Sequence, residues 1–203
     1  IRMSPERVLV IGDWTGTLAL SLRGAGSNVV EHDVATLDEE RPLKGEQFDL
    51  IVNLSSVDRV NDLPGALLHM RNALADDGLM VASFLGAGSL PNLRRAMIAS
   101  EPDRPTARMH PLVDNQAASA LLQRALFKRQ VVDSRRLTVS FASLDRLVSD
   151  LRDQGLGSTL ANVPPPLGKR AKTRADNAFM TAANDKGRVL EIFEILTLTG
   201  WKD

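Results

Sequence analysis

The chain has 203 residues and contains no cysteine, no tyrosine and only three histidines (His32, His69 and His110). The missing cysteines exclude disulfides, thiolate metal ligands, iron–sulfur ligation and cysteine nucleophiles. The missing tyrosines exclude a phenolic acid, base or nucleophile. None of the three histidines is spaced from another as metal ligands usually are, so we expect no metal site. Any reaction at this chain must therefore use a small set of reactive side chains.

A charge excess and long apolar runs are also missing. The chain has 25 basic and 25 acidic residues and a formal net charge of zero, so we expect no nucleic-acid partner, which usually requires a basic excess. No run reaches the roughly 18 apolar residues of a membrane span. No secretory signal precedes the folded part, and the first residue is Ile1. We expect a cytoplasmic chain that begins inside a longer gene product; its oligomeric state is not predictable.

Strands and helices are expected to alternate in the first half of the chain. The apolar run Phe48–Leu54 is typical of a strand buried on both faces of a parallel sheet. Asp62 and Pro64 mark a helix start, as N-cap and first-turn residue. The expected strands are 7–11, 28–34, 48–54 and 79–85, with a turn at 76–78 before the last. This alternation predicts an α/β fold with a doubly wound sheet.

The second half is expected to be less regular. Helices are predicted at 93–100, 116–126, 144–154 and 170–184, and strands at 130–132, 137–141 and 189–199. The basic pair Arg135-Arg136 is interpreted as the turn between the first two of these strands, and 163–166 as a proline-rich loop. We expect three parts: a cofactor-binding half at 1–85, an α/β lid or substrate insertion at 86–167, and a helix and strand at 168–203 that complete the sheet.

The sharpest local feature is the turn Gly12-Asp13-Trp14-Thr15-Gly16 between the first strand and the first helix. A glycine turn at this place lets the backbone approach a ligand, and the helix N-terminus favours polar or anionic groups. Asp33 ends the next strand, where a carboxylate can accept hydrogen bonds from ribose hydroxyls. The pattern predicts a site for a nucleotide or a nucleoside-containing cofactor, although a two-glycine turn also occurs for structural reasons alone.

Several segments resemble the class I S-adenosylmethionine-dependent methyltransferases. The stretch from Val8 to Gly16 is similar to the first motif of this family, Asp33 matches its acidic ribose position, and Phe48–Val52 resembles its fourth strand. The likeness is closest to the branch that holds the malonyl-acyl-carrier-protein methyltransferase of biotin synthesis and the complex I assembly factor that hydroxylates an arginine. The segments that carry this narrower likeness are Asn61–Pro64, Leu90–Arg94, Leu121–Ala125 and Leu198–Trp201.

The resemblance implies a Rossmann-like methyltransferase sheet with a lid insertion, and S-adenosylmethionine as cofactor. By this likeness, Gly12, Asp13 and Gly16 contact the methionine part, and Asp33 or Glu31 contacts the ribose. Ser55 and Asp58 would lie near the transferred methyl group. The remaining expected cofactor contacts are Trp14, Asn53 and Leu54. The implied substrate is a carboxylate on a small molecule or a carrier protein, with a protein partner as the alternative.

The chain also departs from the family pattern. Val10 replaces an acidic residue and Trp14 a glycine in the first motif, so an indole stands where the family leaves space for the cofactor. Asp58-Arg59 replaces a His-Trp pair, Gly88 an acidic residue and Phe141 a tyrosine. Only residues 34–47 separate Asp33 from the fourth strand, too few for a further helix and strand. Either one αβ unit is lacking and Asp33 matches a later acidic position, or a segment is absent from this sequence.

These departures favour a second hypothesis, in which the chain is a non-catalytic assembly or binding protein that acts on a protein partner. Hydroxylation of an arginine ranks last, because the sequence shows no metal-ligand set. Asp49 is interpreted mainly as a local capping residue. Two basic clusters, at 128–136 and 169–174, are expected to be solvated surfaces or sites for an acidic partner.

Overall fold

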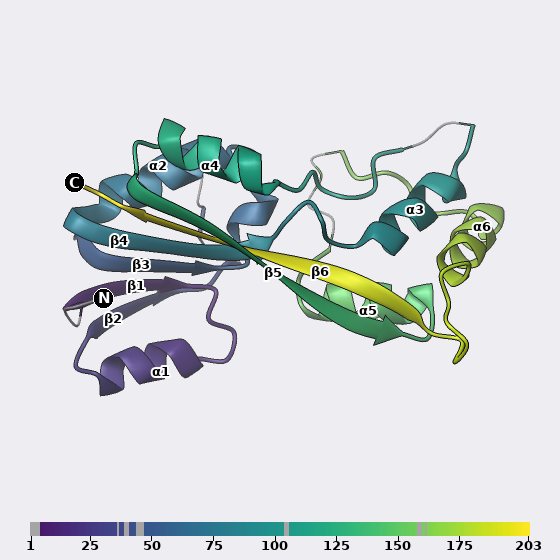
Figure 1. The fold of residues 1–203 in the computed structure, drawn as a ribbon, viewed down its shortest axis with the longest axis horizontal. Coiled ribbons are helices and arrows are strands. Elements are labelled where there is room, and N and C mark those ends of the chain that lie inside the picture. The colour runs from purple at the N-terminus through teal and green to yellow at the C-terminus, as the bar shows by residue number, and fades with distance from the viewer. Residues whose placement is uncertain are drawn as a thin grey trace. The chain divides into compact units, whose positions relative to one another are not determined.

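The structure is a computed structural model that describes residues 5–35, 37–38, 41–43, 47–103, 106–157, 160 and 162–203 (Figure 1). The strands are β1 (Arg7–Ile11), β2 (Asn28–His32), β3 (Phe48–Leu54), β4 (Leu74–Leu85), β5 (Lys128–Phe141) and β6 (Val189–Trp201). The helices are α1 (Thr17–Gly24), α2 (Leu63–Ala73), α3 (Pro91–Ser100), α4 (Asn115–Arg124), α5 (Leu144–Asp153), α6 (Lys169–Met180) and the 3₁₀ helix η1 (Val57–Arg59). None of the helices in the described ranges is long and apolar enough to cross a membrane.

The chain divides into two compact units. The first comprises Ile1–Gly86, Val113–Arg135 and Ile195–Asp203, and the second comprises Ala87–Leu112 and Arg136–Glu194. The first unit contains β1 to β4, together with η1, α1, α2 and α4. The second contains α3, α5 and α6. Strands β5 and β6 run through both units.

The described strands form one sheet in the order β2-β1-β3-β4-β6-β5. The pairs β1–β2, β1–β3 and β3–β4 are parallel, whereas β4–β6 is antiparallel. The chain moves from β1 outward to β2 and then returns to the other side of β1 to form β3. The topological switch point therefore lies between β1 and β3, and open α/β sheets bind ligands at the carboxyl ends of the strands beside such a point. This topology confirms the predicted α/β, doubly wound fold.

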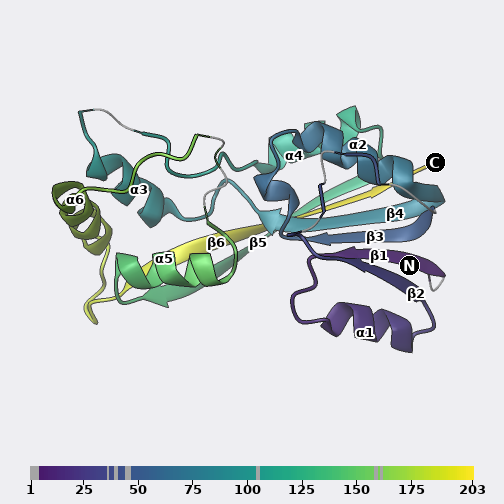
Figure 2. The same ribbon diagram turned by 180° about the vertical axis from the view of Figure 1, so that it is seen from behind.

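Both faces of this sheet are covered in the first unit (Figures 1 and 2). Leu9 and Ile11 of β1 pack on the face covered by α2 and α4, in a core that includes Leu67 and Leu122. Val8 and Val10 point to the opposite face, where α1 contributes Ala19. The side chains of β1 alternate between the two faces, which is why the strand reads as a continuous apolar run. Val10, at the position that is acidic in the resembling family, is fully buried among apolar side chains.

Most of the predicted elements are confirmed, although several bounds differ and one predicted turn is wrong. Strands β1 and β3 have the predicted bounds, and Asp62 caps α2 by accepting a hydrogen bond from the amide of Gly65 at 3.0 Å. Strand β4 begins at Leu74, earlier than predicted, and 76–78 forms an irregularity within it where the register with β3 shifts. Strand β2 ends at His32. The predicted turn at Arg135-Arg136 is wrong, because β5 is one continuous strand.

Between β2 and β3, the described residues form no helix or strand. The sequence analysis predicts that residues 34–47 are too few for a further helix and strand. Of these residues, 36, 39, 40 and 44–46 lie outside the described residues. Among the described strands, β2 is the last on its side of the sheet.

The second unit has its own core and two buried carboxylates. Leu93, Leu147 and Phe179 bring α3, α5 and α6 together. The Glu191 carboxylate accepts hydrogen bonds from the amides of Leu93 at 2.9 Å and Asn92 at 3.2 Å. These amides belong to the first turn of α3 and therefore have no acceptor within the helix itself. Buried Glu191 therefore caps this helix from a neighbouring strand.

Candidate functional site

Gly12 occupies the carboxyl end of β1 in a conformation that favours glycine. Its φ is +78°, and its amide donates to the carbonyl oxygen of His32 at 3.2 Å. A Cβ atom at this position would stand 2.2 Å from the carbonyl oxygen of Leu54 and 3.0 Å from Cγ2 of Val34. The ends of β1 and β3 and the chain after β2 thus meet at Gly12 without room for a side chain. This close approach of backbone explains the first glycine of the turn.

Asp13 organises the turn and the start of α1. Its Oδ2 accepts the amide N–H of Ala19 at 2.9 Å, and its Oδ1 accepts the hydroxyl of Thr15 at 3.2 Å. The hydrogen bond from Ala19 is the main cause that lowers the pKa of Asp13 below its usual 3.8, and burial acts in the opposite direction. Asp13 is therefore ionised at neutral pH and stabilises the helix N-terminus. Its carboxylate is already occupied by the protein's own donors.

Trp14 and Gly16 complete the turn. The amide of Trp14 donates to the Gly12 carbonyl at 3.0 Å, while the Trp14 side chain is 66% exposed. Gly16 has a φ of +67°, and a Cβ atom there would have nothing within 4 Å among the described residues. The space beside Gly16 is open, whereas the space beside Gly12 is filled by backbone. The indole does not pack into the core.

The two acidic residues near the end of β2 have different surroundings. Glu31 forms an ion pair with Arg23 of α1, at 2.6 Å between Oε1 and Nη2. Asp33 follows the last residue of β2, and its Oδ1 accepts the amide of Ala35 at 2.8 Å. Because His32 pairs with Ile11, Asp33 lies level with Gly12 at the carboxyl edge of the sheet. Asp33 is thus better placed than Glu31 to face a ligand at this edge.

Strand β3 ends in a polar group that is unusually well buried. Asn53, opposite Ile11 in the sheet, is fully buried, and its Oδ1 accepts the hydroxyl of Ser56 at 2.9 Å. Its Nδ2 has no hydrogen-bond acceptor among the described residues. Ser55 has a φ of +55°, and its amide donates to the carbonyl oxygen of Ser83 at 2.7 Å. Asp58 is buried in η1.

The structure thus joins some of the expected site residues and leaves others apart. Gly12, Leu54 and the chain after Asp33 meet at one point, and Asn53 is adjacent through its pairing with Ile11. Asp13, Trp14 and Gly16 form the adjoining turn. Sequence reasoning missed the contribution of Val34 beside Gly12 and of Ser56 beside Asn53; no motif marks either residue.

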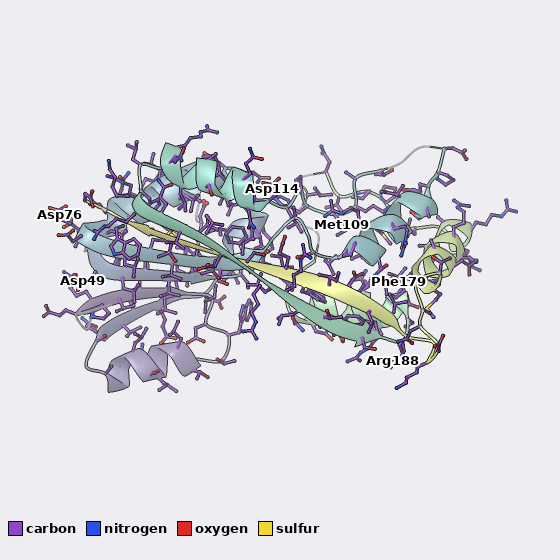
Figure 3. The ribbon with its side chains drawn as sticks, viewed as in Figure 1. Asp49, Asp76, Met109, Asp114, Phe179 and Arg188 are labelled. Atoms are coloured by element: carbon purple, nitrogen blue, oxygen red, sulfur yellow. The ribbon has the colours of Figure 1, made fainter. Side chains whose placement is uncertain are left out.

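Two further expectations from the sequence concern Asp49 and metal ligands. Asp49 lies at the opposite end of β3 (Figure 3), and its Oδ2 accepts the amides of Glu6 at 2.9 Å and Arg7 at 2.8 Å. This confirms the capping interpretation and separates Asp49 from the carboxyl edge. Within the described ranges, no group of three or more acidic or histidine side chains could hold a metal ion.

No family model matches the chain, and the curated relatives that it matches are named as arginine hydroxylases and as methyltransferases. It is 29% identical over 190 residues to the mitochondrial arginine hydroxylase NDUFAF5 of Mus musculus, a match that covers 86% of this chain and 54% of that protein. It is 32% identical over 152 residues to the malonyl-[acyl-carrier protein] O-methyltransferase of Geobacter sulfurreducens, covering 62% of this chain and 57% of the relative. The chain thus spans little more than half the length of these relatives.

Solved structures show the same fold. A candidate methyltransferase from Bacillus halodurans superposes with a TM-score of 0.62 at 14% identity, covering 97% of this chain and 92% of that chain. The phosphoethanolamine N-methyltransferase 2 of Haemonchus contortus, solved with phosphomonomethylethanolamine and S-adenosylhomocysteine, gives a TM-score of 0.54 at 11% identity, covering 97% of this chain and 48% of that chain.

Proposed function

We propose that this chain, which has the fold of the class I S-adenosylmethionine-dependent methyltransferases and is homologous to the branch described above, binds S-adenosylmethionine at the carboxyl edge of β1, β2 and β3. The observation that carries the proposal is the close approach of Gly12 to Leu54 beside the topological switch point. A turn packed this tightly presents backbone, not side chains, to a ligand.

The residues present fit such a cofactor. The open space beside Gly16 and the N-terminus of α1 would receive the methionine part, with Asp13 holding the turn in shape. Asp33 would accept hydrogen bonds from the ribose hydroxyls, since Glu31 is held by Arg23. The unpaired Nδ2 of Asn53 is a buried donor without a protein acceptor, and a cofactor or substrate acceptor would satisfy it.

The proposed reaction is transfer of a methyl group to a carboxylate on a small molecule or a carrier protein. S-adenosylmethionine would supply a methyl group bonded to a positively charged sulfur. When the carboxylate attacks the methyl carbon, the bond to sulfur breaks and the neutral thioether S-adenosylhomocysteine leaves readily. The protein then needs to position the acceptor and exclude water, and no dedicated base is required. This chemistry is compatible with a chain that lacks cysteine and tyrosine. The acceptor class rests on homology to the malonyl-carrier methyltransferase alone, and we propose residues 86–167 as the part that selects it.

A second candidate function is a non-catalytic assembly or binding role toward a protein partner. The burial of Val10 in the apolar core beneath α1 favours this role. The family pattern has an acidic side chain at this position, and here an apolar side chain that only packs in the core takes its place. The indole of Trp14 on the cofactor-facing turn favours it as well. In this alternative the sheet is kept as a scaffold.

Calorimetric titration of S-adenosylhomocysteine into the purified chain tests the cofactor site, and incubation with methyl-labelled S-adenosylmethionine and carrier-bound malonate tests the transfer. Binding with label transfer supports the enzyme. Binding without transfer to any carboxylate acceptor supports the scaffold with a retained cofactor site. Absence of binding at millimolar ligand contradicts the proposal.

A further inference from the structure

A buried carboxylate of the second unit holds the loop that follows β4. Glu194 of β6 accepts the amide N–H of Gly88 at 2.8 Å through Oε2, and its side chain is 11% exposed. The hydroxyl of Ser89 donates to the backbone carbonyl oxygen of Glu194 at 3.0 Å and accepts the amide N–H of Glu194 at 2.9 Å. These hydrogen bonds fix two consecutive loop residues to one residue of β6.

Gly88 is required by this carboxylate and not by its own backbone. Its φ lies outside the left-handed region that favours glycine, so the backbone conformation would accept a side chain. A Cβ atom at residue 88, however, would stand 2.6 Å from Oε2 and 2.9 Å from Cδ of Glu194. The resembling family has an acidic side chain at this position. Here the space is filled by a carboxylate that comes from β6 instead.

Two arginines of the second unit contact the same loop. Nε of Arg136, in β5, stands 3.9 Å from Oε1 of Glu194, and Nη2 of Arg94, in α3, donates to the carbonyl oxygen of Ala87 at 3.5 Å. The side chain of Arg136 is 72% exposed. A guanidinium carries five N–H donors in a rigid fork that matches the two oxygens of a carboxylate. Arg136 can therefore offer this fork to a ligand in solution.

We propose that Arg136 recognises the carboxylate of the methyl acceptor, and that Glu194 is the positioning residue that holds the loop and this guanidinium together. The identity of the ligand rests on the proposed function, whereas an anion site at this loop does not require the cofactor. Arg136 lies in the part of the chain that we propose to select the acceptor. The methylated product is an ester without a negative charge, so it would lose this contact.

The opposing possibility is that Arg136 and Glu194 form an ordinary surface ion pair, which contributes little. Titration of malonate into the isotope-labelled chain, followed by NMR, separates the two. The proposal predicts saturable shifts of the Gly88 amide and the Arg136 Nε–H resonances, whereas the neutral diester dimethyl malonate should shift neither. The absence of saturable shifts at millimolar malonate overturns the proposal.

The acceptor carboxylate can belong to a small molecule or to a carrier protein, and a second titration distinguishes these sources. Carrier-bound malonate that binds more tightly than free malonate assigns the acceptor to a carrier protein. Equal affinity assigns it to a small molecule. Both results support recognition of the carboxylate, and carrier-bound malonate that leaves the Arg136 resonance unshifted contradicts it.

Substitution of Arg136 tests the recognition directly. Arg136→Gln should raise the dissociation constant of malonate at least about fivefold, because a neutral amide forms no charge-assisted hydrogen bonds. Arg136→Lys should give an intermediate value, since it keeps the charge and loses the fork. Arg152→Gln, at an exposed residue of α5, is the matched control and should bind malonate as the parent chain does. Equal weakening in Arg136→Gln and Arg152→Gln would indicate a general charge effect and overturns the proposal.

Glu194→Gln tests the positioning role. The glutamine oxygen can still accept the Gly88 amide, but the charge that attracts Arg136 is removed. The Arg136 Nε–H should become more mobile, as measured by its heteronuclear NOE, while the Gly88 amide stays ordered. Unchanged mobility of the Arg136 side chain overturns the positioning role.

Calorimetry with S-adenosylhomocysteine keeps this inference separate from the proposed function. Malonate binding without cofactor binding would contradict the proposed reaction and support the anion site. Cofactor binding without any malonate-induced shift in the parent chain would overturn this inference alone.

Discussion

Gly12 and Leu54 are in contact through the backbone: a Cβ atom at residue 12 would stand 2.2 Å from the carbonyl oxygen of Leu54. This contact joins the ends of β1 and β3 beside the switch point of the sheet. It leaves the glycine turn as exposed backbone next to Asp33 and Asn53. The proposed cofactor site depends on this relationship more than on any side chain.

Gly12→Ala should both unfold the chain more easily and abolish binding of S-adenosylhomocysteine. The positive φ alone costs about 1–2 kcal/mol for an L-residue, and the clash with backbone should bring the loss of unfolding free energy to at least about 3 kcal/mol. Gly26→Ala is the matched control, because its φ is +95° and nothing lies within 4 Å of its Cβ position. Urea denaturation of both variants measures the difference; equal losses would contradict the contact.

Asp13→Ala should destabilise the fold at neutral pH and flatten its acid dependence. The pKa of Asp13 is lowered in the folded state, mainly by the amide of Ala19, so its contribution is present above the unfolded pKa of 3.8 and is lost as the pH falls through the folded pKa. We expect a loss of about 1 kcal/mol at pH 7, as for other helix N-terminal acceptors. Urea denaturation between neutral pH and pH 3 checks this, with Asp185→Ala, at an exposed turn residue, as control. A variant as acid-sensitive as the parent would refute this role.

Trp14→Gly should tighten binding of S-adenosylhomocysteine several-fold. The indole is exposed on the turn that the cofactor must approach, so its removal clears space at little cost to the core. Trp14→Phe keeps a bulky ring and should bind like the parent chain. Titration calorimetry measures both. Clear weakening in Trp14→Gly would show that the indole contacts the ligand.

Asn53→Ala should weaken binding of the cofactor or its product by about tenfold, if the buried Nδ2 donates to the ligand. Ser56→Ala is the control, because it removes the hydroxyl that donates to Oδ1 and keeps the Nδ2 donor. It should change affinity by less than about threefold. Equal effects in the two variants would assign Asn53 a structural role only.

The sequence predicted the fold well where both faces of a strand are covered. Phe48–Leu54 and Arg7–Ile11 are apolar throughout, so their bounds are visible in the pattern. Strand β5 has almost no buried side chains, so it lacks the alternation that marks strands, and Arg135-Arg136 was misread as a turn. Its extended conformation comes from pairing with β6, which is distant in sequence.

The candidate site was predicted in outline only. The glycine turn and Asp33 were found from residue type and order. The engagement of Glu31 by Arg23, the capping role of Asp13 and the unpaired amide of Asn53 depend on tertiary contacts that no local pattern reveals. The same holds for Glu191, whose buried carboxylate caps a helix from another strand.

The most direct test of the central claim is titration calorimetry of S-adenosylhomocysteine against the purified chain, with Gly12→Ala and Gly26→Ala in parallel. The account predicts one molecule bound per chain, binding lost in Gly12→Ala and retained in Gly26→Ala under conditions where both variants are folded. No heat of binding to the parent chain at millimolar ligand, or unchanged affinity in Gly12→Ala, would contradict it.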